Sequence, residues 1–217
     1  MHILNSIYQK LLKHYGQQHW WPAETQFEVT IGAILAQNVS WANAAKAIQN
    51  LKQHNLLHPQ KLFHLEPAAI APLIKSSGYY NQKAAAIAVF LHWFKKYDFE
   101  FEILQKLPTE VLRKELLSIP RIGPETADSI LLYALERKIF VVDAYTKRIF
   151  TRLGLLTGNE DYAAIQDLFH KHFKGSVHDY NEYHALIVKH GKDICTKKPQ
   201  CEFCCIKRYC AWNESRK

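Results

Sequence analysis

Residues 116–148 read LLSIPRIGPETADSILLYALERKIFVVDAYTKR, and this stretch decides the fold. It predicts a helix that ends before Pro120, because a proline ring clashes inside a helix and has no N–H to donate. Gly123 can adopt the backbone angles of a tight hairpin, and Pro124 suits the first turn of a second helix. The apolar residues that recur at helical spacing in this second helix are Ala127, Ile130, Leu131 and Ala134.

The same stretch carries two features that suit chemistry. The first turn of the second helix directs free N–H groups towards the hairpin, an arrangement that favours a phosphate. Asp143 follows the apolar run 139–142, so we expect its carboxylate at the edge of a cleft. Residue type and place alone also fit a plain N-cap for a helix that starts at Ala144.

The rest of the chain predicts an all-α protein, without a strand pattern beyond the short run 139–142. Pro59, Pro67 and Pro108 fall at or near expected helix starts. The expected helices outside the hairpin cover residues 1–15, 27–36, 40–54, 59–64, 67–75, 81–97, 100–106, 108–117, 144–153, 159–173 and 179–191.

Composition narrows the classes of partner. The chain has 217 residues, is 48% hydrophobic and carries a formal charge of +8. A basic surface favours nucleic acid, although a merely soluble basic protein has the same charge. No apolar run reaches the roughly 18 residues of a membrane span, and the first residues lack the pattern of a signal peptide. We therefore expect a cytoplasmic protein.

The five cysteines lie within sixteen residues at the end of the chain. Four of them, at positions 195, 201, 204 and 210, follow the spacing C-x5-C-x2-C-x5-C. In a reducing compartment such clustering favours metal ligation over disulfides. Four thiolates suit an iron–sulfur cluster or zinc, and Cys205 offers an alternative to Cys204 as the third ligand.

These motifs together resemble the helix-hairpin-helix DNA glycosylases of the endonuclease III superfamily. The resemblance spans nearly the whole chain and includes GAILAQN at 32–38, GYYNQKA at 78–84 and the terminal cysteines. The Trp-Trp-Pro at 20–22, the Tyr-Asn-Gln-Lys-Ala at 80–84 and the run 125–128 are most similar to the 3-methyladenine DNA glycosylase III branch.

The resemblance implies two helical lobes with a cleft between them. One lobe is a six-helix barrel, here 19–131, which holds most of the helix-hairpin-helix motif. The other joins residues 1–18 to 132–217 and ends in the cysteine loop 195–210. The hairpin and Asp143 are expected at the mouth of the cleft.

Asp143 is the catalytic residue that the resemblance implies. Cleavage of a base from deoxyribose builds positive charge on the sugar, which a carboxylate stabilises while it orients or deprotonates water. Glu125 stands where bifunctional relatives carry the lysine that forms a Schiff base with the sugar. A glutamate cannot do so, which predicts an enzyme without lyase activity; Glu125 also suits the dipole of a helix start.

The resemblance also implies an aromatic pocket for an extruded base. Trp20, Trp21 and Pro22 would line it, and Trp41 would supply the opposite wall. Aromatic faces grip flipped bases and favour positively charged alkylpurines, although core packing is the ordinary role of tryptophan. Lys192 is expected near this pocket or, as we favour, in solvent or facing DNA.

Several further residues are expected to contact DNA. Gln37 resembles the residue that fills the gap left by the base, or it is a helix-end amide. Asn81, also an N-cap candidate, and Lys83 lie in a turn that approaches DNA. The hairpin set is expected to bind a phosphate without base preference; it comprises Arg121, Ile122, Gly123, Glu125 and Thr126. Arg121 replaces a common glycine, so it either adds a phosphate contact or restricts the hairpin.

The sequence therefore predicts a monomeric, monofunctional DNA glycosylase that binds double-stranded DNA and excises alkylated purines such as 3-methyladenine and 7-methylguanine. The resemblance favours a [4Fe–4S] cluster over zinc on Cys195, Cys201, Cys204 and Cys210, with a structural role. Two alternatives stay open: a glycosylase for oxidised pyrimidines or mismatched bases, and a DNA-binding protein without turnover.

Overall fold

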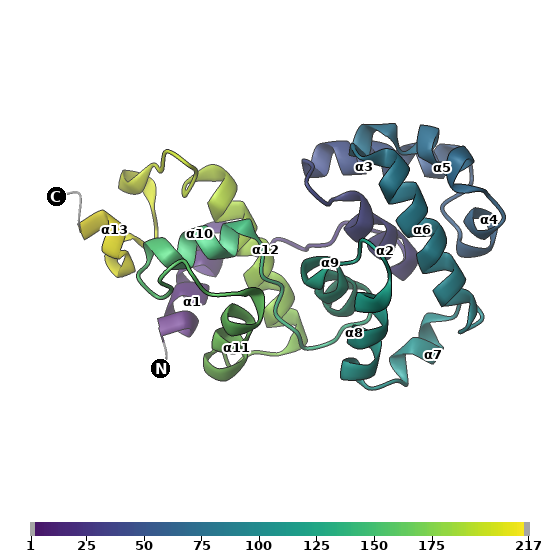
Figure 1. Cartoon of the computed structure of the whole chain (residues 1–217). Helices are drawn as coiled ribbons and strands as arrows, with labels where there is room; N and C mark the ends of the chain where they lie inside the picture. The colour runs from purple at the N-terminus through teal and green to yellow at the C-terminus, as the bar shows by residue number, and fades with distance from the viewer. Residues whose placement is uncertain (1–2, 215–217) are drawn as a thin grey trace. The chain divides into compact units, whose positions relative to one another are not determined.

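The structure is a computed structural model that describes residues 3–214. Its chain divides into two compact units, which we call the terminal unit (Met1–Trp20 with Lys138–Lys217) and the central unit (Trp21–Arg137). The family resemblance implies boundaries after residues 18 and 131. Within the described residues every regular element is helical, which confirms the all-α class (Figure 1).

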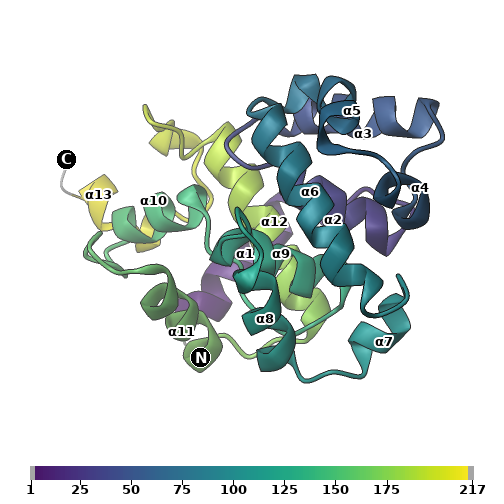
Figure 2. The same cartoon turned by 45° about the vertical axis from the view of Figure 1, so that its right-hand side comes forward.

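The central unit contains eight α-helices and two shorter helical turns. They are α2 (Gln26–Leu35), α3 (Trp41–Gln53), α4 (Pro59–Phe63), α5 (Pro67–Leu73), η1 (Lys75–Ser77), α6 (Tyr80–Lys95), α7 (Phe101–Gln105), α8 (Thr109–Ser118), α9 (Pro124–Ser129) and η2 (Ile130–Ala134). Pro59, Pro67 and Pro124 occupy the first turns of their helices, as the sequence predicts. Helix α6 packs against α5 and α2 and supplies the largest aromatic side chains of the core (Figure 2).

The terminal unit joins the two ends of the described chain. Its helices are α1 (Ile3–Tyr15), α10 (Ala144–Arg152), α11 (Tyr162–His172), α12 (Val177–Asp193), η3 (Cys201–Phe203), η4 (Lys207–Tyr209) and α13 (Ala211–Glu214). Helix α12 packs against both α1 and α10. Gly191 permits the close approach of α12 to α10, because a Cβ there would lie 2.4 Å from Cδ1 of Tyr145.

Two local features differ from the predicted pattern. The second hairpin helix is α-helical only to Ser129 and continues as the π-helix η2, whose five residues are all buried. The run 139–142 is buried but forms no regular element. No helix among the described residues combines the length and the apolarity that a membrane crossing requires.

Candidate active site

Asp143 is the N-cap of α10, and its side chain is only 10% exposed. Its Oδ1 accepts hydrogen bonds from the backbone N–H of Thr146 at 2.7 Å and from the Thr146 hydroxyl at 2.8 Å. The predicted capping role is therefore present. Capping uses one carboxylate oxygen, and Oδ2 lies 3.5 Å from Nε2 of His184 on α12.

The charge state of Asp143 follows from these neighbours. Burial would raise the pKa of its carboxyl group, but the imidazole of His184 and the two donors of Thr146 outweigh burial. The pKa of Asp143 consequently lies below its ordinary value. The carboxylate is thus ionised at neutral pH, and it can accept a proton or stabilise positive charge but has no proton to donate.

Helix α11 fixes the segment that leads to Asp143. The backbone N–H of Phe140 donates to Nε2 of His170 at 3.0 Å, and the Phe140 carbonyl accepts from the side chain of Gln166 at 2.6 Å. The N–H of Val142 donates to the hydroxyl of Tyr162 at 3.3 Å. These three partners recur at four-residue intervals on one face of α11, so they satisfy a buried extended backbone as a neighbouring strand would.

Helix α10 also holds the start of the cysteine loop. Arg148 donates to the carbonyls of Cys195 and Gly191, each at 2.9 Å. Arg152 donates to the Thr196 carbonyl at 2.6 Å and approaches Sγ of Cys195 at 3.3 Å. The helix that begins at Asp143 is therefore tied by its later turns to the first cysteine.

The cysteines are all free thiols, half-buried in the loop. Burial raises the pKa of Cys204 to about 12, and the charges of Cys205, Cys195 and Cys210 add to the shift. The pKa of Cys210 is raised by burial and also by Cys195 and Cys201. The charges of Cys195, Cys201, Cys205 and Cys210 therefore act on Cys204, on Cys210 or on both, and the charge of Lys10 lowers the pKa of Cys205.

The donor set can be tested against the expected groups. Among residues 3–214, no three His, Cys, Asp or Glu side chains converge as they would on a single metal ion. Tetrahedral zinc draws its four sulfurs close together, whereas an iron–sulfur cluster has a core of its own and accepts thiolates that stand farther apart. Four cysteine side chains in one loop supply the donors that either an iron–sulfur cluster or zinc requires.

His190 on α12 singles out one of the candidate ligands. Its ring is 1% exposed, with Nδ1 2.8 Å from the hydroxyl of Tyr15 and Nε2 3.5 Å from Sγ of Cys204. Burial lowers the pKa of His190 to about 4, so the ring is neutral and carries one N–H. When Tyr15 donates to Nδ1, that N–H points at the sulfur of Cys204 and not at Cys205.

The hairpin of the central unit connects α8 to α9 through residues 119–123. Arg121 adopts a φ of 73°, in the left-handed region that favours glycine, whereas Gly123 is extended with a φ of −85°. The expectation that Gly123 supplies the unusual backbone angle is therefore wrong, since Arg121 does so. Ile122 is buried and its N–H donates to the Ile119 carbonyl at 3.0 Å, so neither its side chain nor its N–H faces a phosphate.

A buried ion pair fixes the angle between the two hairpin helices. Arg113 of α8 donates to both carboxylate oxygens of Asp128 on α9, at 2.7 and 3.0 Å. Asp128 is completely buried. This paired contact gives geometric specificity, and it leaves Arg121, Gly123 and Glu125 exposed at the tip of the motif.

Gln37 and Lys83 form a second connection to the hairpin. The amide of Gln37 donates to the Arg121 carbonyl at 2.9 Å and to the hydroxyl of Thr126 at 2.8 Å. The ammonium of Lys83 is 4% exposed and donates to the carbonyls of Leu35, Gln37 and Ser77. Burial lowers the pKa of Lys83 to about 8.

The structure changes two expectations at this turn. The ammonium of Lys83 donates to three internal carbonyls, so its DNA contact stays a prediction that these bonds do not favour. Asn81 is not the N-cap of α6, since the cap residue is Tyr79, which adopts the left-handed conformation. Asn81 is exposed in the first turn of α6, and the ring of Tyr79 is 67% exposed beside it.

The aromatic residues of the central unit form a contact group rather than two parallel walls. The rings of Trp21 and Trp41 meet edge to face, with centroids 5.0 Å apart and an interplanar angle of 90°. Tyr133 of η2 lies 5.3 Å from Trp21 on another side. Trp21 rests against Gly32, where a Cβ would lie 3.2 Å from the indole. The edge-to-face contact leaves no room for a base between Trp21 and Trp41.

The remaining expected pocket residues divide between the units. Pro22 is exposed in the central unit, whereas Trp20 is half-buried in the terminal unit. Lys192 is exposed in the last turn of α12, in line with the solvated position that we favour. Of the expected pocket residues, Trp21 and Trp41 are therefore in contact, and Lys192 lies on α12 of the terminal unit.

Comparison with known proteins identifies the family of this chain. The model of the HhH-GPD superfamily of base excision DNA repair proteins matches residues 31–174. This chain belongs to that superfamily. A protein of Methanocaldococcus jannaschii that bears the name of a DNA repair glycosylase is 46% identical over 210 residues, covering 96% of each chain. Endonuclease III of Sulfolobus acidocaldarius is 29% identical over 98% of this chain and 97% of its own.

Solved structures agree with the HhH-GPD assignment. The 3-methyladenine DNA glycosylase of H. pylori, bound to 1,N6-ethenoadenine, has a TM-score of 0.75 at 29% identity and covers 88% of this chain and 95% of its own. Endonuclease III in a non-covalent DNA complex has a TM-score of 0.84 at 20% identity over 99% of this chain and 96% of its own. The second likeness concerns the fold alone.

In this HhH-GPD protein, several residues that complete the site escape sequence reasoning. His184, Thr146 and Tyr133 are ordinary core residues by pattern, and only their contacts with Asp143 and Trp21 distinguish them. The spacing Tyr162, Gln166, His170 is a usable signal, because polar residues on the buried face of a helix need a partner.

Proposed function

We propose that this protein is a monofunctional DNA glycosylase that removes alkylated purines from double-stranded DNA. The observation that carries the proposal is Asp143, a buried carboxylate whose pKa is lowered by His184 and Thr146. An ionised acid cannot protonate a departing base. It therefore suits a base that leaves without protonation, and a purine alkylated at N3 or N7 already carries the positive charge that the glycosidic electron pair neutralises.

The proposed reaction is hydrolysis of the N-glycosidic bond. The bond from C1′ to the purine breaks, and its electron pair leaves with the base. The carboxylate of Asp143 stabilises the positive charge that develops on the sugar. It also accepts a proton from the attacking water, whose oxygen bonds to C1′. An abasic site and a neutral alkylpurine are the products.

Recognition is assigned to the central unit. The group formed by Trp21, Trp41 and Tyr133 presents aromatic faces, which attract a cationic base more strongly than a neutral one. Arg121 and the exposed tip of the hairpin are assigned to a phosphate. The likeness to the 3-methyladenine DNA glycosylase of H. pylori supports the alkylpurine class.

We base the proposed absence of lyase activity on position 125 and on the contacts of Lys83. Position 125 holds an exposed glutamate, which cannot form an imine. Lys83, the lysine of the 78–84 motif, has its three donors bound to carbonyls. We expect no covalent complex with abasic DNA after borohydride reduction.

A [4Fe–4S] cluster is proposed on Cys195, Cys201, Cys204 and Cys210. When bound, such a cluster would supply a rigid cross-link rather than a hydrolytic step. The residues of this chain that would position it are Arg148 and Arg152, which hold the loop at Cys195, and His190, which faces Cys204.

The deciding experiment is base release from a panel of lesions by the wild type and by Asp143→Asn. Asparagine is as good an N-cap as aspartate, so this variant keeps α10 intact and loses the charge. We expect release of 3-methyladenine and 7-methylguanine by the wild type, and intact lesion binding without release by the variant. Release of oxidised pyrimidines instead would assign the substrate of endonuclease III, and binding without any release would indicate a DNA-binding protein.

A further inference from the structure

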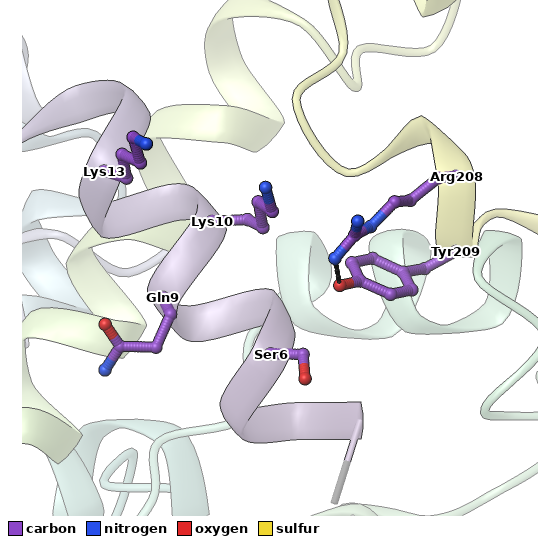
Figure 3. Close-up of a pocket in the computed structure, with 6 residues that line it drawn as sticks. All are labelled: Ser6, Gln9, Lys10, Lys13, Arg208 and Tyr209. Atoms are coloured by element: carbon purple, nitrogen blue, oxygen red, sulfur yellow. Dashed lines mark hydrogen bonds between the residues drawn. The ribbon is translucent and has the colours of Figure 1, made fainter. Parts of the chain in front are cut away.

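A cavity of about 320 Å³ lies in the terminal unit between α1 and the cysteine loop. Figure 3 shows its lining, with α1 on one side and the turn η4 on the other. The lining residues are Ser6, Gln9, Lys10, Lys13, Arg208 and Tyr209. The volume falls at the small end of the range of ligand sites, and none of these residues takes part in the proposed chemistry of Asp143.

The positive charges that line the cavity have no negative partner in its lining. Lys10, Lys13 and Arg208 line it, and no aspartate or glutamate does. Among the described residues none of these three cations forms an ion pair with a carboxylate. Like charges that share a small cavity repel one another, so an anion that enters gains energy from all three.

The helix face that lines the cavity follows from the sequence of α1. Residues 6, 10 and 13 recur at helical spacing, whereas Leu4, Ile7, Tyr8 and Leu11 on the other side are buried. Helix α1 contains no acidic residue. Lys10 is half-buried and lines the cavity together with Arg208 and Tyr209 of the loop, so it faces the loop.

The loop supplies donors of a second kind. The guanidinium of Arg208 donates to the hydroxyl of Tyr209 and lies 4.5 Å from the centre of its ring. In Figure 3 the Lys10 side chain leaves α1 on the side that faces this pair. The hydroxyl groups of Ser6 and Tyr209 add neutral donors, a combination that suits the oxygen atoms of a phosphate.

We propose that this cavity is a phosphate-binding site, and we call it the α1–loop site. Its ligand is a phosphate ester, supplied either by the backbone of DNA or by a small phosphate compound. The proposal is independent of base excision, because the site contains neither Asp143 nor the aromatic group. A bound phosphate would connect α1 to the cysteine loop, because its negative charge would interact with cations from both.

The test compares two double variants with equal loss of charge. Lys10→Gln/Arg208→Gln removes two cations of the site, and Lys171→Gln/Lys174→Gln removes two exposed lysines elsewhere in the terminal unit. Pyrophosphate binding by the full-length protein is measured by calorimetry, and affinity for undamaged duplex DNA is measured as a function of salt.

We expect the site variant to bind pyrophosphate about tenfold more weakly than the control, since two charge-assisted contacts are lost. If DNA is the source, the variant's affinity for the duplex also falls and its salt dependence flattens by the equivalent of about one to two phosphates. If only pyrophosphate binding falls, the ligand is a small phosphate compound. Equal behaviour of both variants in both measurements overturns the proposal, whatever the excision assay shows.

Discussion

Nε2 of His184 lies 3.5 Å from Oδ2 of Asp143, and both side chains are at least nine-tenths buried. His184 belongs to α12, whereas Asp143 caps α10, so the packing of these two helices sets the distance. This contact, with the donors of Thr146, keeps the pKa of a buried carboxyl group below its ordinary value.

Replacement of His184 by phenylalanine should therefore raise the pKa of Asp143. Excision needs the ionised carboxylate, so activity is lost as pH falls through the folded-state pKa. In the wild type this acid limb lies below the ordinary aspartate value of about 3.9, and in His184→Phe it should move to higher pH. The measurement is the pH dependence of single-turnover base release, with folding followed by circular dichroism.

The same shift has a consequence for stability with a definite sign. A depressed pKa in the folded state adds stability that is fully present above the unfolded-state pKa and is lost as pH falls through the folded value. His178→Gln, an exposed change on the same helix, is the matched control for base release and should leave the acid limb of release unmoved. An acid limb that stays in place in His184→Phe would remove His184 from the control of Asp143.

Arg121 offers a second test, because its side chain and its backbone angle have opposite effects. A non-glycine residue in the left-handed region costs about 1–2 kcal/mol, and Arg121 has a φ of 73°. Arg121→Gly should accordingly be more stable than Arg121→Ala by about 1 kcal/mol in denaturant unfolding, after allowance for the freedom that glycine adds to the unfolded chain.

Both Arg121 variants lose the same charge, which isolates its contribution to DNA binding. If Arg121 contacts a phosphate, both should bind duplex DNA more weakly, with a salt slope smaller by about one. Wild-type affinity in both variants would assign Arg121 to hairpin geometry alone.

The sequence predicts these features unevenly, and the hairpin shows why. Pro120 and Pro124 determine where helices end and begin, because proline acts through local sterics that need no tertiary contact. Which hairpin residue takes the left-handed backbone angle depends on how α8 packs against α9. The Arg113–Asp128 pair holds these two helices together. The pattern alone assigned it to Gly123, whereas the structure assigns it to Arg121.

Burial of polar residues was the other feature beyond sequence reasoning. Lys83 reads as a surface lysine at a helix start, because lysine is rarely buried. Its position inside the central unit follows from three carbonyls that meet only when α2, η1 and α6 are packed. His184 is similar, since nothing in its local sequence indicates a carboxylate from another helix.

Lys83→Met should test the internal role of this lysine. The change leaves the carbonyls of Leu35, Gln37 and Ser77 without their donor, which should cost about 3 kcal/mol of unfolding free energy. The affinity for duplex DNA below the melting temperature should keep its salt slope. Lys46→Met, which removes an exposed lysine of the same unit, should leave stability nearly unchanged. A reduced salt slope in Lys83→Met would restore the DNA contact expected from sequence.

The choice between Cys204 and Cys205 can be decided by single serine variants. Cys204 faces His190 and interacts with Cys195 and Cys210. Cys204→Ser should therefore abolish most of the bound iron, and Cys205→Ser should retain it, as measured by iron content and visible absorption of the purified protein. The reverse result would assign Cys205 as the third ligand, and zinc in place of iron would remove the cluster.

The aromatic group supplies the last prediction. Because Trp21 and Trp41 touch edge to face, a bound base can stack on an open indole face but cannot lie between them. Trp41→Ala should remove a stacking face and weaken lesion binding by about 1–3 kcal/mol, measured with duplex that carries a non-cleavable analogue of the lesion. Affinity for undamaged duplex should change little, since backbone contacts supply most of it.

The control for Trp41→Ala is Trp212→Ala, which removes a 44% exposed tryptophan from α13 of the terminal unit. It should bind both duplexes as the wild type does. Equal weakening of damaged and undamaged DNA by Trp41→Ala, with a lowered melting temperature, would indicate that Trp41 only packs against Trp21. Selective loss of lesion binding at an unchanged melting temperature would indicate an indole face that meets the extruded base.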